Sequence, residues 1–420
     1  MPVRAQDKPG WGLPCGASCP LAHNAAHGLA PSLPLPPGFA LGQGAVLFWI
    51  PVLSAALYRL ALLLMITLGL VGPAHAVSVT FINPGRSNEA YWVAAASAMV
   101  QAARSLDLQL EVKYAERDHL KALEIAASLA ARPAGQRPDY VVFSNDYATG
   151  PEILRLLNGS GIKAMMAFSG IHGADRRHTG GPREKYDFWL GTLEPRAEDA
   201  GYLTAKTLIE KGRRAQLRGA DGLLHVIAIA GDRSTPSSAA RNAGLQRALA
   251  EASDVVLDQI VYANWSRETA LTKSRWLVRR HPDARLVWAG SDQMAFGAMQ
   301  AWREHADVPG KDVLFSGVNT STEALNAVRS GELSALAGGH FMAGAWVLVM
   351  IHDHAKGHDF AQSEGLELVV PMFILFTPPL AERFMQRFAA DSGTLDFRRY
   401  SLALNPRLVH YDFDVGDLLR

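Results

Sequence analysis

From residue 77 onward, short apolar segments alternate with longer amphipathic ones, and this alternation limits the fold more than any other feature of the sequence. Runs such as VSVTFI, DYVVFS and KAMMAFS have the length and apolar composition of buried strands. The segments between them, such as residues 91–106 and 120–131, carry apolar side chains at helical spacing. Strands that alternate with helices in this way form parallel sheets with helices on both faces.

The alternation occurs in two series, separated by a basic, glycine-rich loop at residues 172–187. In the second series, strands such as LLHVIAIAG and ARLVWAG alternate with expected helices at residues 196–211, 239–251 and 267–280, and with a last helix from Gln293. Together the two series are too long for one ordinary domain. We therefore predict an α/β fold with two doubly wound parallel-sheet lobes and a ligand cleft between them.

The first 76 residues differ from the rest, because their only charged residues are Arg4, Asp7, Lys8 and Arg59. The run LYRLALLLMITLGLVGPAHA has a basic start, an apolar core and a small-x-small end, which are the parts of a secretory signal peptide. We expect cleavage after Ala76 and export to the periplasm. The alternative joins the preceding run GAVLFWIPVLSAAL to this segment as one inner-membrane anchor, with the rest of the chain facing the periplasm.

Several patterns argue against a metal site, a cofactor or an enzyme. The run CGASCPLAHNAAH at residues 15–27 contains the only two cysteines at zinc-like spacing, but no pattern for a small metal-binding domain follows it. His354 and His358 are four residues apart, but Gly357 is expected to end their helix. The sequence has no GxGxxG, P-loop, HExxH or GxSxG motif. A formal net charge of +1 gives no electrostatic reason to expect nucleic-acid binding.

In open α/β sheets, ligands bind at the carboxyl ends of the strands, so the residues that follow each expected strand are candidates for a site. Aromatic, amide, guanidinium and carboxylate groups recur there. The candidates are Asn83, Asn88, Tyr91, Trp92, Ser169, Arg241, Trp265, Asp292 and Asn319. Aromatic faces stack on the C–H side of a sugar ring, and the planar polar groups form paired hydrogen bonds with neighbouring hydroxyls. The set therefore predicts a polyhydroxylated ligand, although Asp292 also has a simpler explanation as a helix cap.

These residues resemble the type I periplasmic binding proteins, the sugar-binding family of ABC importers, over roughly residues 77–357. The run SDQMAFGAMQAW is similar to the family's Asn-Asp-x-Met-Ala-x-Gly-Ala segment, whose acid binds ligand hydroxyls, and SSAARNAGLQRAL resembles its arginine-bearing helix. The resemblance implies ligand-binding roles for Tyr91, Trp92, Arg241, Trp265, Asp292 and Asn319. Three residues depart from the family pattern, because Ser291 replaces an asparagine and Ser169-Gly170 replaces an Asp-Arg pair. We therefore expect the ligand to be recognised differently from the way the family recognises ribose.

The resemblance also implies a mechanism and a partner. Three crossings between the lobes, expected near residues 192–195, near residues 317–320 and after Lys356, act as a hinge while ligand closes the cleft. The expected lobe 1 is residues 77–192 plus 320–357, and lobe 2 is residues 193–319 plus 358–420 with a C-terminal extension. A monomer that delivers a sugar or polyol to an ABC permease is the first hypothesis. The alternative is a ligand sensor, similar to autoinducer-binding proteins, that signals to a membrane sensor kinase or cyclase.

Overall fold

The structure is a computed structural model that describes residues 76–388 and 395–419. The predicted signal peptide, the alternative anchor and the cysteine-containing run lie in residues 1–75, outside the described residues. Within the described ranges, the longest and most apolar helices still fall short of what a membrane span requires.

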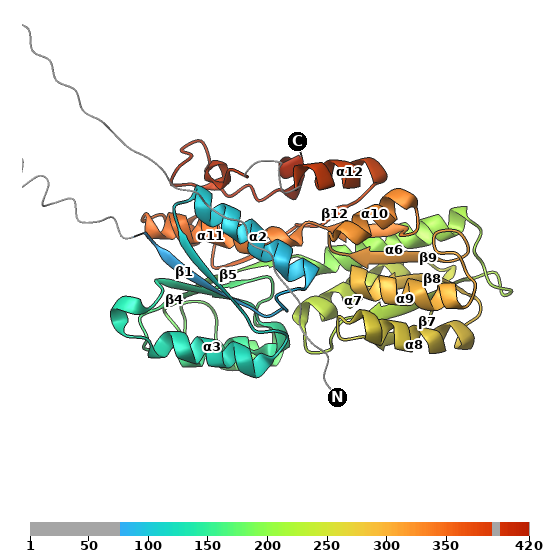
Figure 1. Cartoon of the computed structure of the whole chain (residues 1–420), viewed down its shortest axis with the longest axis horizontal. Helices are drawn as coiled ribbons and strands as arrows, with labels where there is room; N and C mark the ends of the chain where they lie inside the picture. The colour runs from blue at the N-terminus through green and yellow to red at the C-terminus, as the bar shows by residue number, and fades with distance from the viewer. Residues whose placement is uncertain (1–75, 389–394, 420) are drawn as a thin grey trace, which may run out of the picture. The chain divides into compact units, whose positions relative to one another are not determined.

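Lobe 1 is built on a six-stranded parallel sheet with the order β11-β5-β4-β3-β1-β2 (Figure 1). Its strands are β1 (Ser78–Asn83), β2 (Gln109–Tyr114), β3 (Tyr140–Phe143), β4 (Lys163–Ala167), β5 (Trp189–Pro195) and β11 (Glu367–Val370). Its helices are α2 (Ala90–Ser105), α3 (His119–Ala131), α4 (Gly150–Leu157), α5 (Gly173–Thr179) and α11 (Ala343–Ala355). The helices α2 and α11 pack together on one face, and α3 and α4 pack together on the other, so the sheet is buried on both sides.

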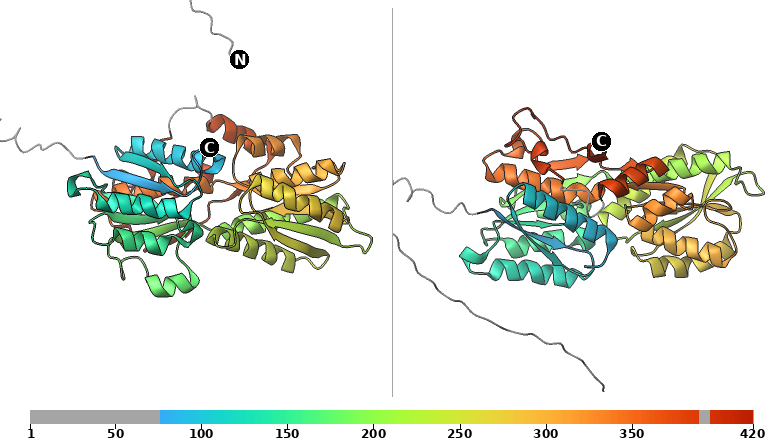
Figure 2. Two further views of the ribbon diagram at one scale, coloured as in Figure 1. Left: turned by 60° about the horizontal axis from the view of Figure 1, so that its bottom comes forward. Right: turned by 45° about the horizontal axis from the view of Figure 1, so that its top comes forward.

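Lobe 2 repeats this plan with the strand order β12-β10-β9-β8-β6-β7, in which only β12 is antiparallel to its neighbour. Its strands are β6 (Leu224–Ala230), β7 (Val255–Tyr262), β8 (Ala284–Ala289), β9 (Leu314–Val318), β10 (Ala335–Gly338) and β12 (Ile374–Leu375). Its helices are α6 (Ala197–Arg214), α7 (Pro236–Ala250), α8 (Arg267–Arg280), α9 (Asp292–Glu304), α10 (Thr322–Ser330) and α12 (Pro378–Arg387). The predicted fold of two doubly wound lobes is therefore confirmed, and Figure 2 shows the lobes side by side in two further views.

Local sequence explains where individual elements begin and how closely they pack. Ser266 precedes α8, and its hydroxyl accepts a hydrogen bond from the backbone N–H of Thr269, which caps the helix. The helices α6 and α7 approach closely because Gly201 of α6 has no side chain. A Cβ at this position would lie 1.9 Å from the carbonyl oxygen of Arg241 in α7. The predicted basic loop at residues 172–187 contains the short helix α5, which the glycine-rich composition did not indicate.

The chain crosses between the lobes three times: between β5 and α6, between β10 and α11, and between β11 and β12. The first crossing comes directly after the expected residues 192–195, which themselves lie in β5. The expected crossings at residues 317–320 and directly after Lys356 are wrong. The strand β10 pairs with β9, which keeps the chain in lobe 2 until Gly338, and β11 pairs with β5, which keeps it in lobe 1 until Val370.

The expected lobe boundaries change accordingly. The segment 320–338 carries α10 and β10 and belongs to lobe 2, whereas the segment 358–370 carries β11 and belongs to lobe 1. The sequence does not indicate that the segment 320–338 belongs to lobe 2, because β10 reads ALAG. This run of small residues lacks the β-branched or aromatic composition of a typical strand.

The C-terminal segment, residues 395–419, is also not confined to lobe 2. Its first short helix, η5 (Phe397–Tyr400), packs on α2 and α11 of lobe 1, and its second, η6 (Val415–Leu419), packs on α12 of lobe 2. In Figure 1 and in the right view of Figure 2, this segment lies along one side of the molecule, over α11 and beside α12. Because the sheet lies on one side of α11 and the C-terminal segment on the other, α11 is buried from Ala343 to Asp353. Its run AGAWVLVMI is accordingly apolar all round.

Candidate functional site

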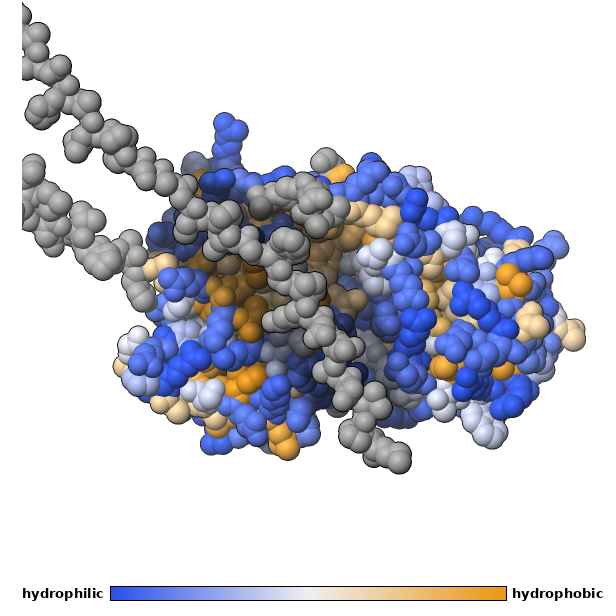
Figure 3. Space-filling model, viewed as in Figure 1, coloured by the Kyte–Doolittle hydropathy of each residue, from blue (hydrophilic) through white to orange (hydrophobic). Residues whose placement is uncertain are grey.

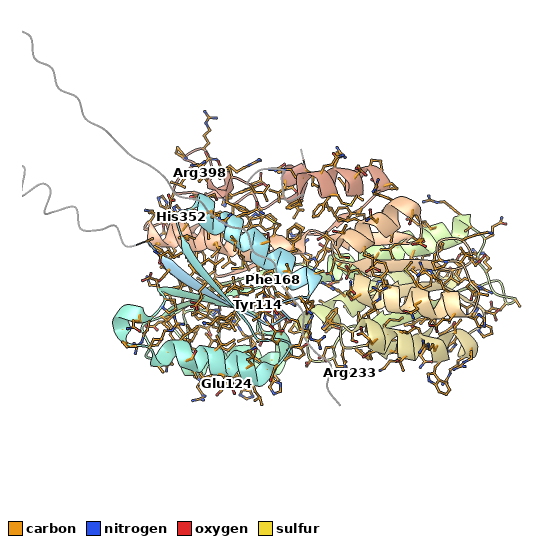
Figure 4. The ribbon with its side chains drawn as sticks, in the orientation of Figure 1. Tyr114, Glu124, Phe168, Arg233, His352 and Arg398 are labelled. Atoms are coloured by element: carbon orange, nitrogen blue, oxygen red, sulfur yellow. The ribbon has the colours of Figure 1, made fainter. Side chains whose placement is uncertain are left out.

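A pocket lies between the lobes at the carboxyl ends of both sheets. It contains about 660 Å³ of empty space, part of it open to solvent. Its lobe 1 wall is formed by Glu89, Ala90, Tyr91, Trp92, Arg117, Asp146 and Phe168. Its lobe 2 wall is formed by Thr235, Ser237, Arg241, Trp265, Ser291, Asp292, Gln293 and Asn319, and His340 joins them from the second crossing. Figure 4 labels Phe168 on the lobe 1 side and Arg233, on the loop before α7, on the lobe 2 side.

The structure brings most of the predicted site residues to this pocket. Those that line it are Tyr91, Trp92, Arg241, Trp265, Asp292 and Asn319. Three others do not line it. Asn83 is buried and uses its side chain to bond the carbonyl of Trp92 and the N–H of Gly85, which fixes the turn before α2. Asn88 is exposed, and Ser169 is buried outside the pocket.

Aromatic rings form the inner part of the lobe 1 wall. Trp92 meets Phe168 edge to face, with ring centroids 5.1 Å apart, and Tyr91 lies against Trp92 at 4.9 Å. The ring of His340 is sandwiched between Tyr91 and Phe373, with both centroid distances 4.6 Å. Aromatic surface therefore reaches from lobe 1 across the second crossing to the third.

Arg241 and His340 form the most buried polar pair of the pocket. Arg241 is 5% exposed, donates from Nη1 to the carbonyl of Gly290 at 2.6 Å, and places Nη2 3.0 Å from Nε2 of His340. Because a guanidinium can only donate, Nε2 of His340 accepts, and the neutral imidazole carries its proton on Nδ1. Burial, together with the charge of Arg241, holds the pKa of His340 well below its usual value. Burial also lowers the pKa of Arg241 to about 10.

Trp265 and Arg241 lie together on the lobe 2 wall. The guanidinium carbon of Arg241 is 5.4 Å from the centre of the Trp265 ring, a cation–π arrangement. Trp265 and the preceding Asn264 both have left-handed backbone conformations, with φ of 60° and 50°. Consecutive non-glycine residues in this region carry backbone strain of a kind that clusters at ligand sites.

Asp292 is 1% exposed and lies at the first turn of α9. Its Oδ1 accepts hydrogen bonds from the N–H of Gln293 at 2.8 Å and from Nδ2 of Asn319 at 2.9 Å. Burial raises the pKa of this carboxyl above its usual value. The helix begins at Asp292 and not at Gln293, and Ser291 is its cap, because the Ser291 hydroxyl accepts from the N–H of Met294. Ser291 is therefore the N-cap residue, and the bond from the N–H of Gln293 to Asp292 is an additional contact in the first turn.

Lobe 1 contributes charges from elements that the strand-end prediction did not include. Arg117, after β2, forms a two-pronged ion pair with Glu89, before α2, and donates to the hydroxyl of Tyr147 at 3.1 Å. This pair supplies charge to the lobe 1 wall, which has none at Ser169-Gly170. Glu89 neutralises Arg117, so this cation is already paired within lobe 1.

Asp146 follows β3 and is 6% exposed. Burial raises the pKa of its carboxyl to about 6, although the nearby guanidinium of Arg117 acts in the opposite direction. The loop that carries it is held firmly, because the neighbouring Asn145 bonds the carbonyl of Gly170 at 2.8 Å and the N–H of Gly150 at 2.9 Å. Tyr147 and Ala148, which follow, have φ of 58° and 56°. The protein thus holds a buried carboxyl at the pocket on a strained, well-supported turn.

Four pocket residues are absent from the predicted site: Glu89, Arg117, Asp146 and His340. The sequence contains a signal for some of them and not for others. Asp146 and His340 both follow strands, β3 and β10, so the strand-end rule applies to them. Asp146 is not among the predicted site residues, and β10 lacks the composition of a typical strand. Glu89 and Arg117 are brought together from separate elements, and no spacing in the sequence indicates their pairing.

Elsewhere, His354, one of the two histidines considered as metal ligands, has a partner of its own. Nδ1 of His354 lies 2.9 Å from the Tyr140 hydroxyl, and α11 ends at Ala355, before Gly357. In the part of the chain that the structure describes, no group of histidine, cysteine, aspartate and glutamate side chains has the arrangement of a metal site.

Comparison with known proteins gives a consistent result. A family model described as the periplasmic binding protein domain matches residues 79–359. The structure of a periplasmic sugar-binding protein from Pseudomonas fluorescens is 39% identical, covers 82% of this chain and 100% of its own, and superposes with a TM-score of 0.74.

More distant structures share the fold. An ABC transporter solute-binding protein from Bacillus halodurans with bound myo-inositol is 17% identical, with coverage of 74% of this chain and 99% of its own and a TM-score of 0.58. A periplasmic solute-binding protein of an ABC transporter from Actinobacillus succinogenes with bound D-allose is 19% identical. It covers 73% of this chain and 99% of its own, with a TM-score of 0.60.

Among curated proteins, the ribose import binding protein of Bacillus subtilis (strain 168) is 36% identical over 73 residues, which are 17% of this chain and 23% of that protein. The match thus spans about a quarter of that relative's length. The family match over residues 79–359, the two-lobed fold and the structure that is 39% identical lead to one conclusion: the chain belongs to the periplasmic binding protein family.

Proposed function

We propose that this protein captures a small neutral sugar or polyol in the pocket between its lobes and delivers it in the periplasm to an ABC importer. The observation that carries the proposal is the composition of the pocket, in which aromatic faces, a buried arginine and two buried carboxyls converge from both lobes. Such groups match the alternating apolar faces and hydroxyl edges of a sugar ring.

Each wall has a distinct part in recognition. Tyr91 and Trp92 supply aromatic surface from lobe 1, and Trp265 supplies it from lobe 2. Asp146 accepts hydrogen bonds from ligand hydroxyls on the lobe 1 side, and Asp292 accepts them on the lobe 2 side, where its carboxylate is oriented by Asn319 and Gln293. A ligand that bonds both acids joins the lobes, so binding favours the closed arrangement.

The charge balance of the pocket favours an uncharged ligand. Glu89 and Arg117 cancel each other, and Arg241 is the remaining cation beside Asp146 and Asp292. A sugar acid or sugar phosphate brings an anion close to two carboxylates in a partly desolvated site, which is unfavourable. Two of the structural relatives hold bound myo-inositol and bound D-allose, both uncharged polyhydroxylated molecules.

Export and delivery are parts of the same proposal. We infer that residues 1–76 carry the export signal, and N-terminal sequencing of the exported protein tests this. Delivery is tested by uptake of the labelled ligand in cells with and without the gene. Uptake that is unchanged without the protein would refute the importer role.

Ligand binding is tested with a thermal-shift panel of D-ribose, D-allose, D-galactose, myo-inositol and D-galacturonate, followed by titration calorimetry. A ligand that binds only the folded state raises the melting temperature by mass action. We expect a shift with at least one neutral compound, and loss of that shift in Arg241→Ala. A panel in which no compound shifts the protein would count against the proposal.

A further inference from the structure

The C-terminal segment, residues 395–419, is attached to both lobes as well as to the crossings between them. Its attachments form a continuous series along the chain, first on lobe 1, then on the crossings and last on lobe 2.

The attachment to lobe 1 has a buried polar centre in α11. Asp353, fully buried, accepts hydrogen bonds from the Ser401 hydroxyl, from the N–H of Leu402 at 2.7 Å and from the hydroxyl of Tyr411 at 3.1 Å. Glu364 accepts from the N–H of Tyr411 at 3.0 Å. Figure 4 labels His352 and Arg398 in this layer, where the segment covers α11.

Two backbone bonds and an aromatic stack extend this attachment. The N–H groups of Leu395 and Phe397 donate to Gln101 and Ser105 of α2, both at 3.2 Å. Phe413 stacks on Trp346 of α11, with centroids 5.1 Å apart and planes inclined by 15°. The attachment to lobe 1 therefore extends from Leu395 to Phe413.

The chain then passes over the crossings. The methyl groups of Val415 lie against Gly339, at the second crossing, where a Cβ would come within 2.8 Å of one of them. The same Cβ would lie 2.5 Å from the carbonyl oxygen of Met372, at the third crossing. Gly339 has φ of 119°, a conformation that suits glycine. Val415 therefore packs where two crossings meet.

The final attachment is to lobe 2. The helix η6 packs on α12, and the carbonyl of Leu418 accepts from Nε of Arg387 at 3.2 Å. The helix α12 is in turn fixed to α10 by the Arg329–Glu382 ion pair at 2.7 Å and by the packing of the two helices. Figure 3 shows apolar residues gathered in the hollow between the lobes; the groove lined by α2, α10 and α12 contains Leu325, Phe384 and Phe388.

We propose that residues 395–419 form a strap that limits how far the two lobes separate when no ligand is bound. Opening rotates lobe 1 against lobe 2 about the crossings. A segment fixed on α11, on the crossings and on α12 must release one of these attachments for a wide opening, because its passage from Phe413 to Val415 is only two residues long. The strap therefore shifts the ligand-free ensemble towards closed arrangements.

Lengthening the strap without removing its contacts tests the proposal. In the test variant, six Gly/Ser residues are inserted after Phe413, so that every attachment is kept and the short passage to Val415 is lengthened. Donor and acceptor dyes are placed at Glu124→Cys in lobe 1 and Arg280→Cys in lobe 2, both exposed positions, after Cys15 and Cys19 are replaced by serine. Single-molecule energy transfer is then measured without ligand.

We expect the test variant to show a longer mean distance and a broader distribution than the parent chain. A control with the same six residues inserted after Gly222, in an exposed turn of lobe 2, is expected to match the parent. Leu418→Ala, which weakens the lobe 2 end, is expected to shift the distribution in the same direction. Distributions that coincide in the parent and the lengthened variant, or an equal shift in the Gly222 control, would overturn the proposal. This readout needs no ligand, so it is independent of the proposed transport function.

Discussion

Asp146→Asn is expected to stabilise the ligand-free protein at neutral pH while weakening ligand binding. The pKa of this carboxyl is raised from 3.8 to about 6 by burial, a difference of 6 − 3.8 = 2.2. At roughly 1.36 kcal/mol per pKa unit, ionising it in the folded state costs on the order of 3 kcal/mol relative to the unfolded state. The asparagine has nearly the same shape and no charge, so it removes this cost.

The sign of the effect depends on pH in a defined way. The folded pKa of Asp146 lies above the unfolded value, so the folded protein binds more protons between pH 4 and 6. The contribution of this carboxyl to stability is therefore fully present below about pH 4 and is lost as the pH rises through about 6. The gain from Asp146→Asn should be largest above pH 7 and close to zero at pH 4.

Urea unfolding of the ligand-free protein, followed by tryptophan fluorescence at pH 7.5 and pH 4.0, measures this difference. We expect a gain of about 1–3 kcal/mol at pH 7.5 for Asp146→Asn, and no change at either pH for Asp283→Asn, which is exposed. An Asp146→Asn variant that is less stable than the parent at pH 7.5, or equally stabilised at both pH values, would refute the reasoning. Weaker ligand binding in the same variant would link the strain of the site to its function.

Three further outcomes are expected. Asp292→Asn should keep the melting temperature near that of the parent and weaken binding by about 1–3 kcal/mol, roughly five- to 150-fold, by calorimetry; unchanged affinity would limit Asp292 to a local structural role. Phe384→Ala should lower stability by about 3–5 kcal/mol, because the ring is 4% exposed and packs on Phe341, whereas Leu404→Ala at an exposed position should stay within about 0.5 kcal/mol. Gly339→Ala should lower the melting temperature by several degrees, since its Cβ would clash at the crossings; an unaffected melting curve would contradict the packing there.

The sequence was most informative about elements whose signal is local. The helix α8 has the bounds expected from its periodicity, because Ser266 caps its start and apolar positions such as Leu277 recur on its buried face. The twofold series of strands and helices was likewise predicted, since parallel strands buried on both faces are recognisable as short apolar runs.

Which sheet each strand joins could not be predicted, because strand pairing is a long-range property. The short strand β10 has no strand-like composition, and β11 pairs with β5 across more than 170 residues of chain, so two of the three crossings were misplaced. At the pocket, single residues that follow strands, such as Asp292, were accessible to sequence reasoning. The Glu89–Arg117 pair was not, because its partners are distant in sequence and meet only in the fold.

The strand order of lobe 1 also has a consequence for how the chain folds. The edge strand β11 and the covering helix α11 come after nearly all of lobe 2 in the sequence, so lobe 1 cannot complete its sheet until residue 370 is available. Lobe 2 in turn receives β12 and α12 after that point. Neither lobe can be completed during synthesis before about residue 370, and such long-range pairing makes folding slow. A chain built in this way remains incompletely folded until almost its whole length has emerged.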